Sequence, residues 1–174
     1  MNVALVGSSG YIASYIIQRL EKESDIDSIL KIDQDEKADI KLNLTEAEKF
    51  NYDCLNNIDC VVFTAAISGP DKCAEEFDYC WNINVIGTSY FIEKAIEKNC
   101  RVLFFSSDAV FGDISGHIYD ELSETNAETP YGKMKKAVED KFKGNDKFKA
   151  IRLSYVASVR DRFISYCLEC VTKH

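Results

Sequence analysis

Residues Asn2–Ala13 read NVALVGSSGYIA, and this stretch decides the fold that we expect for the chain. A short apolar run typical of a buried strand passes through glycines into Gly10–Lys22, where apolar residues recur at helical spacing. Gly7 allows a sharp turn from strand to helix, Gly10 lets the backbone approach a pyrophosphate, and Ala13 allows close packing of helix on strand. Because a helix N-terminus attracts phosphate groups, the pattern predicts a dinucleotide-binding turn.

The rest of the chain continues this alternation of short apolar runs and longer amphipathic segments. Strands are predicted at Asn2–Val6, Ser28–Ile32, Asp39–Leu44, Cys60–Ala65, Arg101–Ser106 and Phe148–Leu153, and helices at Gly10–Lys22, Thr45–Leu55, Asp71–Lys98, Tyr131–Lys143 and Arg160–Val171. Thr45 and Glu48 have the spacing of a capping box, and we expect the longest helix to bend near Gly87. Apolar strands that alternate with helices indicate a parallel sheet covered on both faces. We therefore predict an α/β fold of the doubly wound, dinucleotide-binding kind (a Rossmann fold), as one domain over residues 1–174.

Composition excludes several classes of function. The net charge of −8, without a block of Lys and Arg, argues against nucleic-acid binding. No stretch is apolar enough to span a membrane, and the start of the chain is too short for a signal peptide, so we expect a cytoplasmic protein. The seven cysteines have no disulfide spacing, and Cys167 and Cys170 form a C-x-x-C without a second pair, so we predict no metal site.

Asp33 follows the second predicted strand and is the candidate for recognising the cofactor's ribose. A carboxylate there accepts hydrogen bonds from the ribose hydroxyls and repels a 2′-phosphate, which favours NAD over NADP. The alternative is a solvated acid in the run Asp33–Glu36. Lys31 and Lys37 are near enough in sequence to leave NADP open.

Tyr131 and Lys135 form a Y-x-x-x-K pair that lies on one face of a helix. A neighbouring ammonium group lowers the pKa of a phenol, so that Tyr131 could exchange a proton with a carbonyl or alcohol oxygen. Upstream, a strand ends in Ser106 and Ser107, and ligands of doubly wound sheets bind beyond the carboxyl ends of strands. We expect Ser107 to hold the substrate oxygen, with capping of a turn as the alternative for both serines.

In order along the chain, these segments resemble the extended short-chain dehydrogenases/reductases, also described as the NAD-dependent epimerase/dehydratase family. That family contains nucleotide-sugar epimerases, dehydratases and reductases, and the reductases are the most similar. The resemblance rests on Gly7–Ala13, Asn43-Leu44, Asp59–Ala66, Asn84–Thr88, Ser106–Asp108, Tyr131 with Lys135, and Ile151–Val156. It implies a cofactor site formed by Gly7, Ser9, Gly10, Tyr11, Ile12, Asp33, Asn43, Leu44, Ala65, Ala66, Asn84, Ser106, Tyr131 and Lys135, with Asn43 near the adenine.

The activity that the resemblance implies is hydride transfer at a carbon of a nucleotide sugar. Tyr131 would exchange the proton, Lys135 would tune Tyr131 and contact the nicotinamide ribose, and Ser107 would orient the oxygen. A homodimer through the helices Asp71–Lys98 and Tyr131–Lys143 is also implied.

Members of the family continue past the helix that Arg162–Cys167 resembles into a small substrate-binding domain, which we expect to be absent here. Two alternatives to an active enzyme stay open. One is a module that binds NAD(P) and regulates or assembles with a partner, and the other is a folded fragment without activity.

Overall fold

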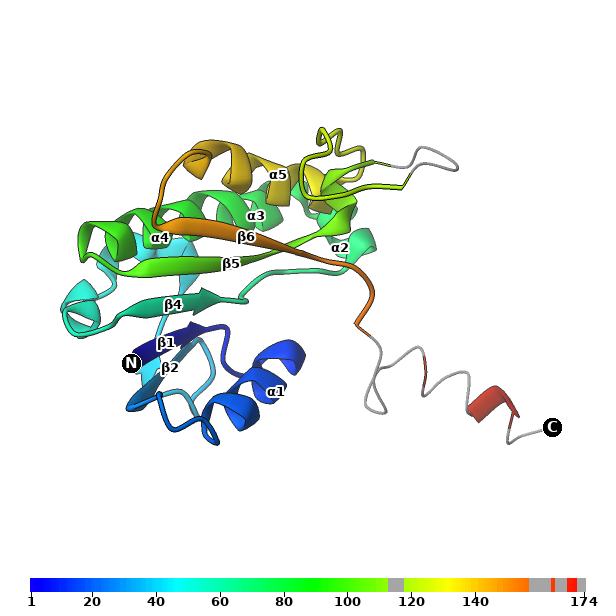
Figure 1. The fold of residues 1–174 in the computed structure, drawn as a ribbon. Coiled ribbons are helices and arrows are strands. Elements are labelled where there is room, and N and C mark those ends of the chain that lie inside the picture. The colour runs from blue at the N-terminus through cyan, green and yellow to red at the C-terminus, as the bar shows by residue number, and fades with distance from the viewer. Residues whose placement is uncertain (113–117, 157–163, 165–168, 172–174) are drawn as a thin grey trace.

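The computed structural model describes residues 1–112, 118–156, 164 and 169–171. It contains one parallel sheet of six strands in the order β3-β2-β1-β4-β5-β6 (Figure 1). The strands are β1 (Asn2–Val6), β2 (Ser28–Asp33), β3 (Ile40–Lys41), β4 (Cys60–Phe63), β5 (Arg101–Ser107) and β6 (Phe148–Leu153). The strand order reverses direction between β1 and β4, which is where ligands bind in folds of this kind. The predicted doubly wound parallel sheet is confirmed.

Helices lie on both sides of this sheet. The α-helices are α1 (Tyr11–Leu20), α2 (Pro70–Glu75), α3 (Phe77–Trp81), α4 (Thr88–Glu97) and α5 (Pro130–Phe142), and the shorter helical segments are η1 (Leu44–Lys49), η2 (Tyr52–Leu55), η3 (Asn82–Gly87) and η4 (Asp108–Val110). Figure 1 shows α1 on one side of the sheet and α3, α4 and α5 on the other. The predicted helix at Arg160–Val171 lies almost entirely outside the described residues.

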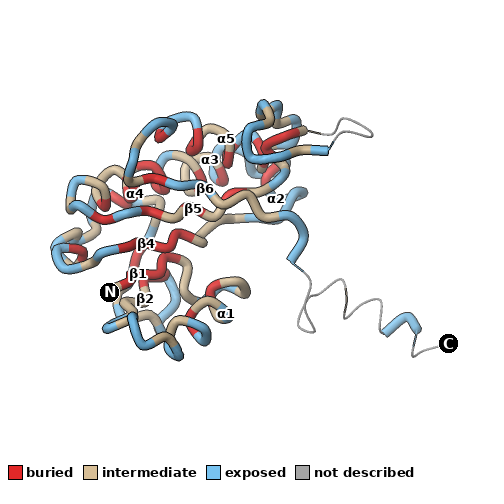
Figure 2. Tube along the Cα trace, in the orientation of Figure 1, coloured by how far each residue is buried: buried red, intermediate tan, exposed pale blue. Residues whose placement is uncertain are grey.

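Alternate residues of the strands build a separate core on each side of the sheet. Val3 and Leu5 of β1 pack with Ala13 and Ile17 of α1. The intervening strand positions face a larger cluster that includes aromatic side chains of α4, α5, β4, β5 and β6. Figure 2 shows the buried residues gathered along the central strands and on the sides of the helices that face them. Complete burial of each such apolar side chain stabilises the fold by about 1.5–3 kcal/mol.

The segment predicted as a helix at Thr45–Leu55 is instead two short 3₁₀ turns, η1 and η2. The residue that caps η1 is Asn43 rather than Thr45, because the Asn43 Oδ1 atom accepts a hydrogen bond of 3.1 Å from the Thr45 backbone N–H. Glu46 has non-helical angles (φ −132°, ψ 38°), which interrupts the turn. The predicted capping box is therefore wrong.

The predicted helix at Asp71–Lys98 is also interrupted, both near Gly87, where a bend was expected, and at Glu76, where none was expected. Glu76 (φ −113°, ψ 48°) separates α2 from α3, and η3 is a π-helical turn in which the Thr88 hydroxyl donates to the carbonyl of Ile83 at 2.9 Å. The glycine at position 87 serves close packing, since a Cβ atom there would lie 1.9 Å from the carbonyl oxygen of Leu44. This contact seats η3 against the start of η1.

Candidate functional site

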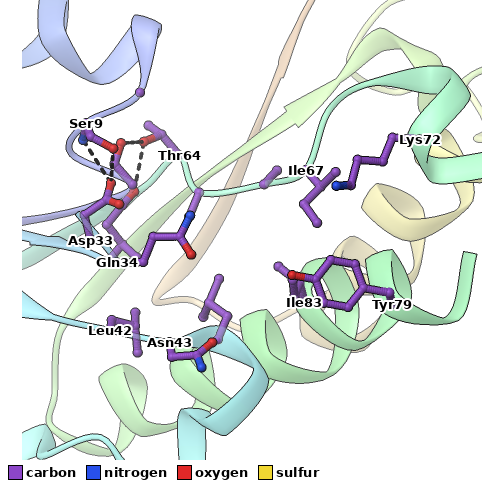
Figure 3. Close-up of a pocket in the computed structure, with 16 residues that line it drawn as sticks. Ser9, Asp33, Gln34, Leu42, Asn43, Thr64, Ile67, Lys72, Tyr79 and Ile83 are labelled. Carbon is purple, nitrogen blue, oxygen red and sulfur yellow. Dashed lines mark hydrogen bonds between the residues drawn. The ribbon is translucent and has the colours of Figure 1, made fainter. Parts of the chain in front are cut away.

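A cavity of about 350 Å³ opens at the carboxyl ends of β1, β2 and β4, where the strand order reverses (Figure 3). Eight of its lining residues are ones that the sequence assigns to the cofactor: Gly7, Ser9, Gly10, Asp33, Asn43, Leu44, Ala65 and Ala66. The other lining residues are Val6, Gln34, Leu42, Thr64, Ile67, Lys72, Tyr79 and Ile83. Segments far apart in the sequence therefore form one concave site, which is the form that ligand sites usually take.

The turn between β1 and α1 requires glycine for two physical reasons. Gly7 has φ +85°, and a Cβ atom there would lie 2.5 Å from the backbone nitrogen of Ala65. Gly10 is the N-cap of α1, so no side chain caps this helix, and its first turn contains no acidic residue. The positive end of the helix dipole is thus directed at the cavity without a competing protein anion in that turn.

The Asp33 carboxylate lies at the cavity, and only 9% of the residue is exposed. Its Oδ2 atom accepts hydrogen bonds from the backbone N–H of Ser9 at 2.9 Å and from the Ser9 hydroxyl at 2.8 Å. Its Oδ1 atom accepts a longer one, of 3.2 Å, from the N–H of Asp35. The carboxylate is therefore held against the glycine turn rather than solvated, which disagrees with the alternative interpretation of Asp33–Glu36.

Asn84 supports the cavity from outside its lining. The side-chain amide of Asn84 donates to the carbonyl of Ile67 at 2.8 Å and accepts from the backbone N–H of the same residue at 2.8 Å. The amide nitrogen also lies 3.5 Å from the sulfur of Met134. This buried side chain links η3 to the segment after β4, and Ile67 in that segment lines the cavity. Tyr11 and Ile12, two other predicted cofactor residues, belong to the first turn of α1 and do not line the cavity either.

Lys135 is buried, and its ammonium group is directed at the end of β5. The Nζ atom donates to the carbonyl of Phe105 at 2.7 Å and lies 4.5 Å from the ring centre of Phe104 and 5.6 Å from that of Tyr131. Burial lowers the pKa of Lys135 to about 7, although the carboxylate of Glu139 acts in the opposite direction. The predicted proximity of Lys135 to Tyr131 on one helix face is present in the structure.

The pKa of Tyr131 moves in the direction opposite to the one predicted. Burial raises it to about 12, and the Cys73 thiol and the Asp108 carboxylate act in the same direction. The Lys135 ammonium group does not reverse this shift, since its Nζ atom donates to the Phe105 carbonyl and lies 5.6 Å from the centre of the Tyr131 ring. In this state Tyr131 is a protonated phenol at neutral pH.

The two serines at the end of β5 have different surroundings. The Ser107 Oγ atom accepts from the Ala109 N–H at 3.2 Å and lies 3.1 Å from the Asp108 carboxylate, so it caps η4 as the alternative interpretation describes. The Ser106 hydroxyl is buried and has no hydrogen-bond partner within the described residues. A Cβ atom at Gly132 would lie 2.3 Å from the Ala109 carbonyl, and this close contact holds the start of α5 beside η4. Neither serine, nor Tyr131 or Lys135, lines the cavity.

Several lining residues were not identified from the sequence. Gln34 and Leu42 are near the predicted Asp33 and Asn43, and this proximity could have drawn attention to them. Lys72, Tyr79 and Ile83 carry no local signal, because only the packing of α2, α3 and η3 brings them to the cavity. Within the described ranges, no helix could cross a membrane, and no group of three or more His, Cys, Asp or Glu residues could hold a metal ion.

Comparisons with known proteins agree with the fold described above. The model of the family described as "NAD dependent epimerase/dehydratase family" matches residues 3–158. A human dTDP-D-glucose 4,6-dehydratase is 28% identical over 158 residues, which cover 79% of this chain and 44% of that protein. The chain therefore spans less than half the length of this curated relative.

Two solved structures show the same fold. The dTDP-4-dehydrorhamnose reductase of Clostridium acetobutylicum superposes with a TM-score of 0.82 at 23% identity, over 100% of this chain and 60% of that one. The corresponding reductase of Bacillus anthracis, solved in complex with NADP, superposes with a TM-score of 0.79 at 20% identity, over 99% of this chain and 60% of that one.

Proposed function

The chain belongs to the NAD dependent epimerase/dehydratase family, and from this premise we propose that it provides the cofactor site of an NAD-dependent reductase, epimerase or dehydratase acting on a nucleotide sugar. The observation that carries the proposal is the cavity at the reversal of strand order, lined by the glycine turn, Asp33 and the Ala65-Ala66 pair. The nucleotide-sugar part rests on the family and on the names of the relatives, among them a dTDP-D-glucose dehydratase and dTDP-4-dehydrorhamnose reductases.

The residues present are suited to a dinucleotide. An uncapped helix N-terminus at Gly10 offers backbone N–H donors for phosphates. The rest of the lining combines apolar side chains with a few polar groups, which is the usual character of a cofactor pocket.

We propose that NAD is preferred to NADP, because Asp33 places a carboxylate at the position where a 2′-phosphate would approach. The structure leaves the Oδ1 atom of Asp33 with only the long hydrogen bond from Asp35, so this atom can still accept from a ribose hydroxyl. The similar reductase of Bacillus anthracis was solved in complex with NADP, so the preference of this chain for NAD over NADP has to be measured.

The proposed chemistry assigns the proton step to Tyr131. When bound, the nicotinamide cofactor supplies or accepts the hydride. Because burial raises its pKa to about 12, the Tyr131 phenol is protonated at neutral pH, and the protonated form is the one that the reduction of a carbonyl group requires. Lys135 holds the end of β5 through the Phe105 carbonyl, and Ser107 would orient the substrate oxygen beside Tyr131.

A second candidate function is a module that binds the dinucleotide without turnover. It is favoured by the Ser107 hydroxyl, which already caps η4, and by the raised pKa of Tyr131, which leaves almost no phenolate at neutral pH to accept a proton. The two candidates differ in whether Tyr131 matters for anything besides folding.

The test begins with calorimetric titration of the purified chain with NAD⁺, NADH, NADP⁺ and NADPH. We expect NAD(H) to bind more tightly than NADP(H), and the variant Asp33→Ala to lose that preference, while Asp35→Ala, an exposed neighbour, retains it. Absence of binding by all four nucleotides would refute the proposed function.

Turnover is then measured with a panel of nucleotide sugars. We expect Tyr131→Phe to abolish turnover without weakening cofactor binding. Turnover by wild type that Tyr131→Phe leaves intact would contradict the assigned proton step, and cofactor binding without any turnover would favour the binding module.

We also propose that the chain forms a homodimer, with α3, η3 and α5 at the interface between the subunits. Phe77 and Ile86 on this stretch are 39% and 57% exposed, so a partner subunit could bury apolar surface there. Light scattering of wild type and of Ile86→Glu tests this: a monomeric wild type would contradict it.

A further inference from the structure

The wall of the cavity that faces the glycine turn contains a lysine that the proposed mechanism does not use. Lys72 lies on α2, and Figure 3 shows its amine directed toward the cavity, across from Ser9 and Asp33. The Nζ atom lies 5.8 Å from the ring centre of Tyr79, another lining residue. A cation over the face of an aromatic ring is attracted by the ring's electrons, so Tyr79 favours this position of the ammonium group.

The charges around the cavity show what Lys72 could do there. Among the described lining residues, Lys72 is the only cation and Asp33 is the only anion. The end of α1 offers phosphates about half an elementary charge, whereas each phosphate of a dinucleotide carries a full negative charge. With a net charge of −8, the chain as a whole also repels such a ligand. A full positive charge at the cavity would therefore strengthen the binding of such a ligand.

The ion pair between Lys72 and Glu76 does not prevent Lys72 from binding a phosphate. Its Nζ atom lies 3.7 Å from the Glu76 carboxylate, and the two side chains are 50% and 52% exposed. Exposed pairs of this length are worth little. A phosphate within reach would compete with Glu76 for the ammonium group, since charge-assisted hydrogen bonds to phosphate are strong.

We propose that Lys72 binds the pyrophosphate of the dinucleotide from the wall opposite the glycine turn, with the Tyr79 ring holding the ammonium group in place. This inference rests on the proposed function, because it concerns the same cavity. It adds a charged side chain from α2 to the phosphate-binding end of the cavity, which the glycine turn forms on the other side.

The test compares ligands that differ in their phosphates. Calorimetric titrations at low ionic strength use adenosine, ADP and NAD⁺ with wild type, Lys72→Gln, Lys72→Arg and Lys149→Gln. Lys149 is an exposed residue of β6 that does not line the cavity, so its substitution removes the same charge elsewhere. We expect Lys72→Gln to weaken ADP and NAD⁺ about tenfold, the value of one charge-assisted hydrogen bond, and to leave adenosine unchanged.

Lys72→Arg and Lys149→Gln should bind all three ligands as wild type does, and added salt should reduce the loss seen with Lys72→Gln. Equal affinity of wild type and Lys72→Gln for ADP and NAD⁺ would overturn this inference and leave the proposed function standing. Parallel loss of adenosine would also overturn it, because the role would then be structural. Failure of wild type to bind any of the three ligands would overturn the proposed function together with the inference.

Discussion

The ion pair between Arg152 of β6 and Glu139 of α5 offers the sharpest test of how this fold is held together. The Arg152 Nε and terminal nitrogen atoms donate to Glu139 Oε2 at 3.1 and 2.8 Å. Only 9% of the Glu139 side chain and 23% of the Arg152 side chain are exposed. The guanidinium group also lies 4.8 Å from the ring centre of Phe111. We predict that Arg152→Met strongly destabilises the protein.

The expected magnitude follows from what the substitution leaves behind. Methionine can fill much of the space of the arginine stem, but the Glu139 carboxylate stays buried without its partner. Breaking a buried pair in this way costs about 3–5 kcal/mol, whereas replacing both members by apolar groups is often neutral. The matched control is Lys141→Met, which breaks a pair of 2.9 Å with Glu93 in which both side chains are 44% exposed. Exposed pairs contribute only about 0–1 kcal/mol.

The assay is urea denaturation followed by far-UV circular dichroism. With a slope of about 2 kcal/mol per molar urea, Arg152→Met should lower the midpoint by about 2 M and the control by less than about 0.5 M. The double variant Arg152→Met with Glu139→Leu should recover most of the loss. Equal midpoints for Arg152→Met and Lys141→Met would refute the reasoning, and a double variant less stable than the single one would show that packing rather than charge dominates.

Three further outcomes are expected. Burial holds the pKa of Lys135 at about 7, below its usual value of 10.5, so the unfolded state binds more protons between these two pH values. Wild type should therefore gain stability relative to Lys135→Met as the pH rises from about 7 to about 9.5, measured by urea denaturation at both pH values. Gly87→Ala places a Cβ atom 1.9 Å from a backbone oxygen and should cost about 3 kcal/mol. Gly144→Ala, at φ +83° in open space, should cost only about 1 kcal/mol. Thermal unfolding of both variants measures these losses, and equal losses would contradict the packing argument. Iodoacetamide should modify the exposed Cys170 in the native protein. It should modify the buried Cys100, whose pKa is raised by burial to about 11, only after denaturation. Peptide mass spectrometry measures the labelling of both residues, and labelling of Cys100 in the native protein would contradict its burial.

The sheet could be predicted from the sequence because its central strands β1, β4 and β5 contain nearly continuous apolar runs, which are typical of a parallel sheet covered on both faces. The helical segments were harder. A helix from Asp71 to Lys98 satisfies the apolar spacing, but the contact of Gly87 with Leu44, the break at Glu76 and the π-helical turn depend on packing between distant segments. Spacing within one helix contains no information about such contacts.

The candidate site divides in the same way. The residues of the glycine turn and Asp33 carry a local pattern, so their position at the cavity could be anticipated. Lys72 and Tyr79 have no such pattern and reach the cavity only through the arrangement of α2 and α3. The direction of the Tyr131 pKa could not be read from its spacing to Lys135, because spacing reveals neither burial nor that the amine donates to the Phe105 carbonyl.

The amide of Asn84 has a consequence for how the cavity responds to a ligand. The Asn84 amide donates to the carbonyl of Ile67 and accepts from its backbone N–H, as a neighbouring strand in a sheet would. Ile67 lies beyond the end of β4, where none of the described strands supplies these hydrogen bonds. The backbone N–H and carbonyl of Ile67 therefore already have hydrogen-bond partners and do not need water or a ligand to supply them. A ligand that enters here would meet a segment whose backbone is already hydrogen-bonded, so less of its binding energy would be spent on ordering this part of the wall.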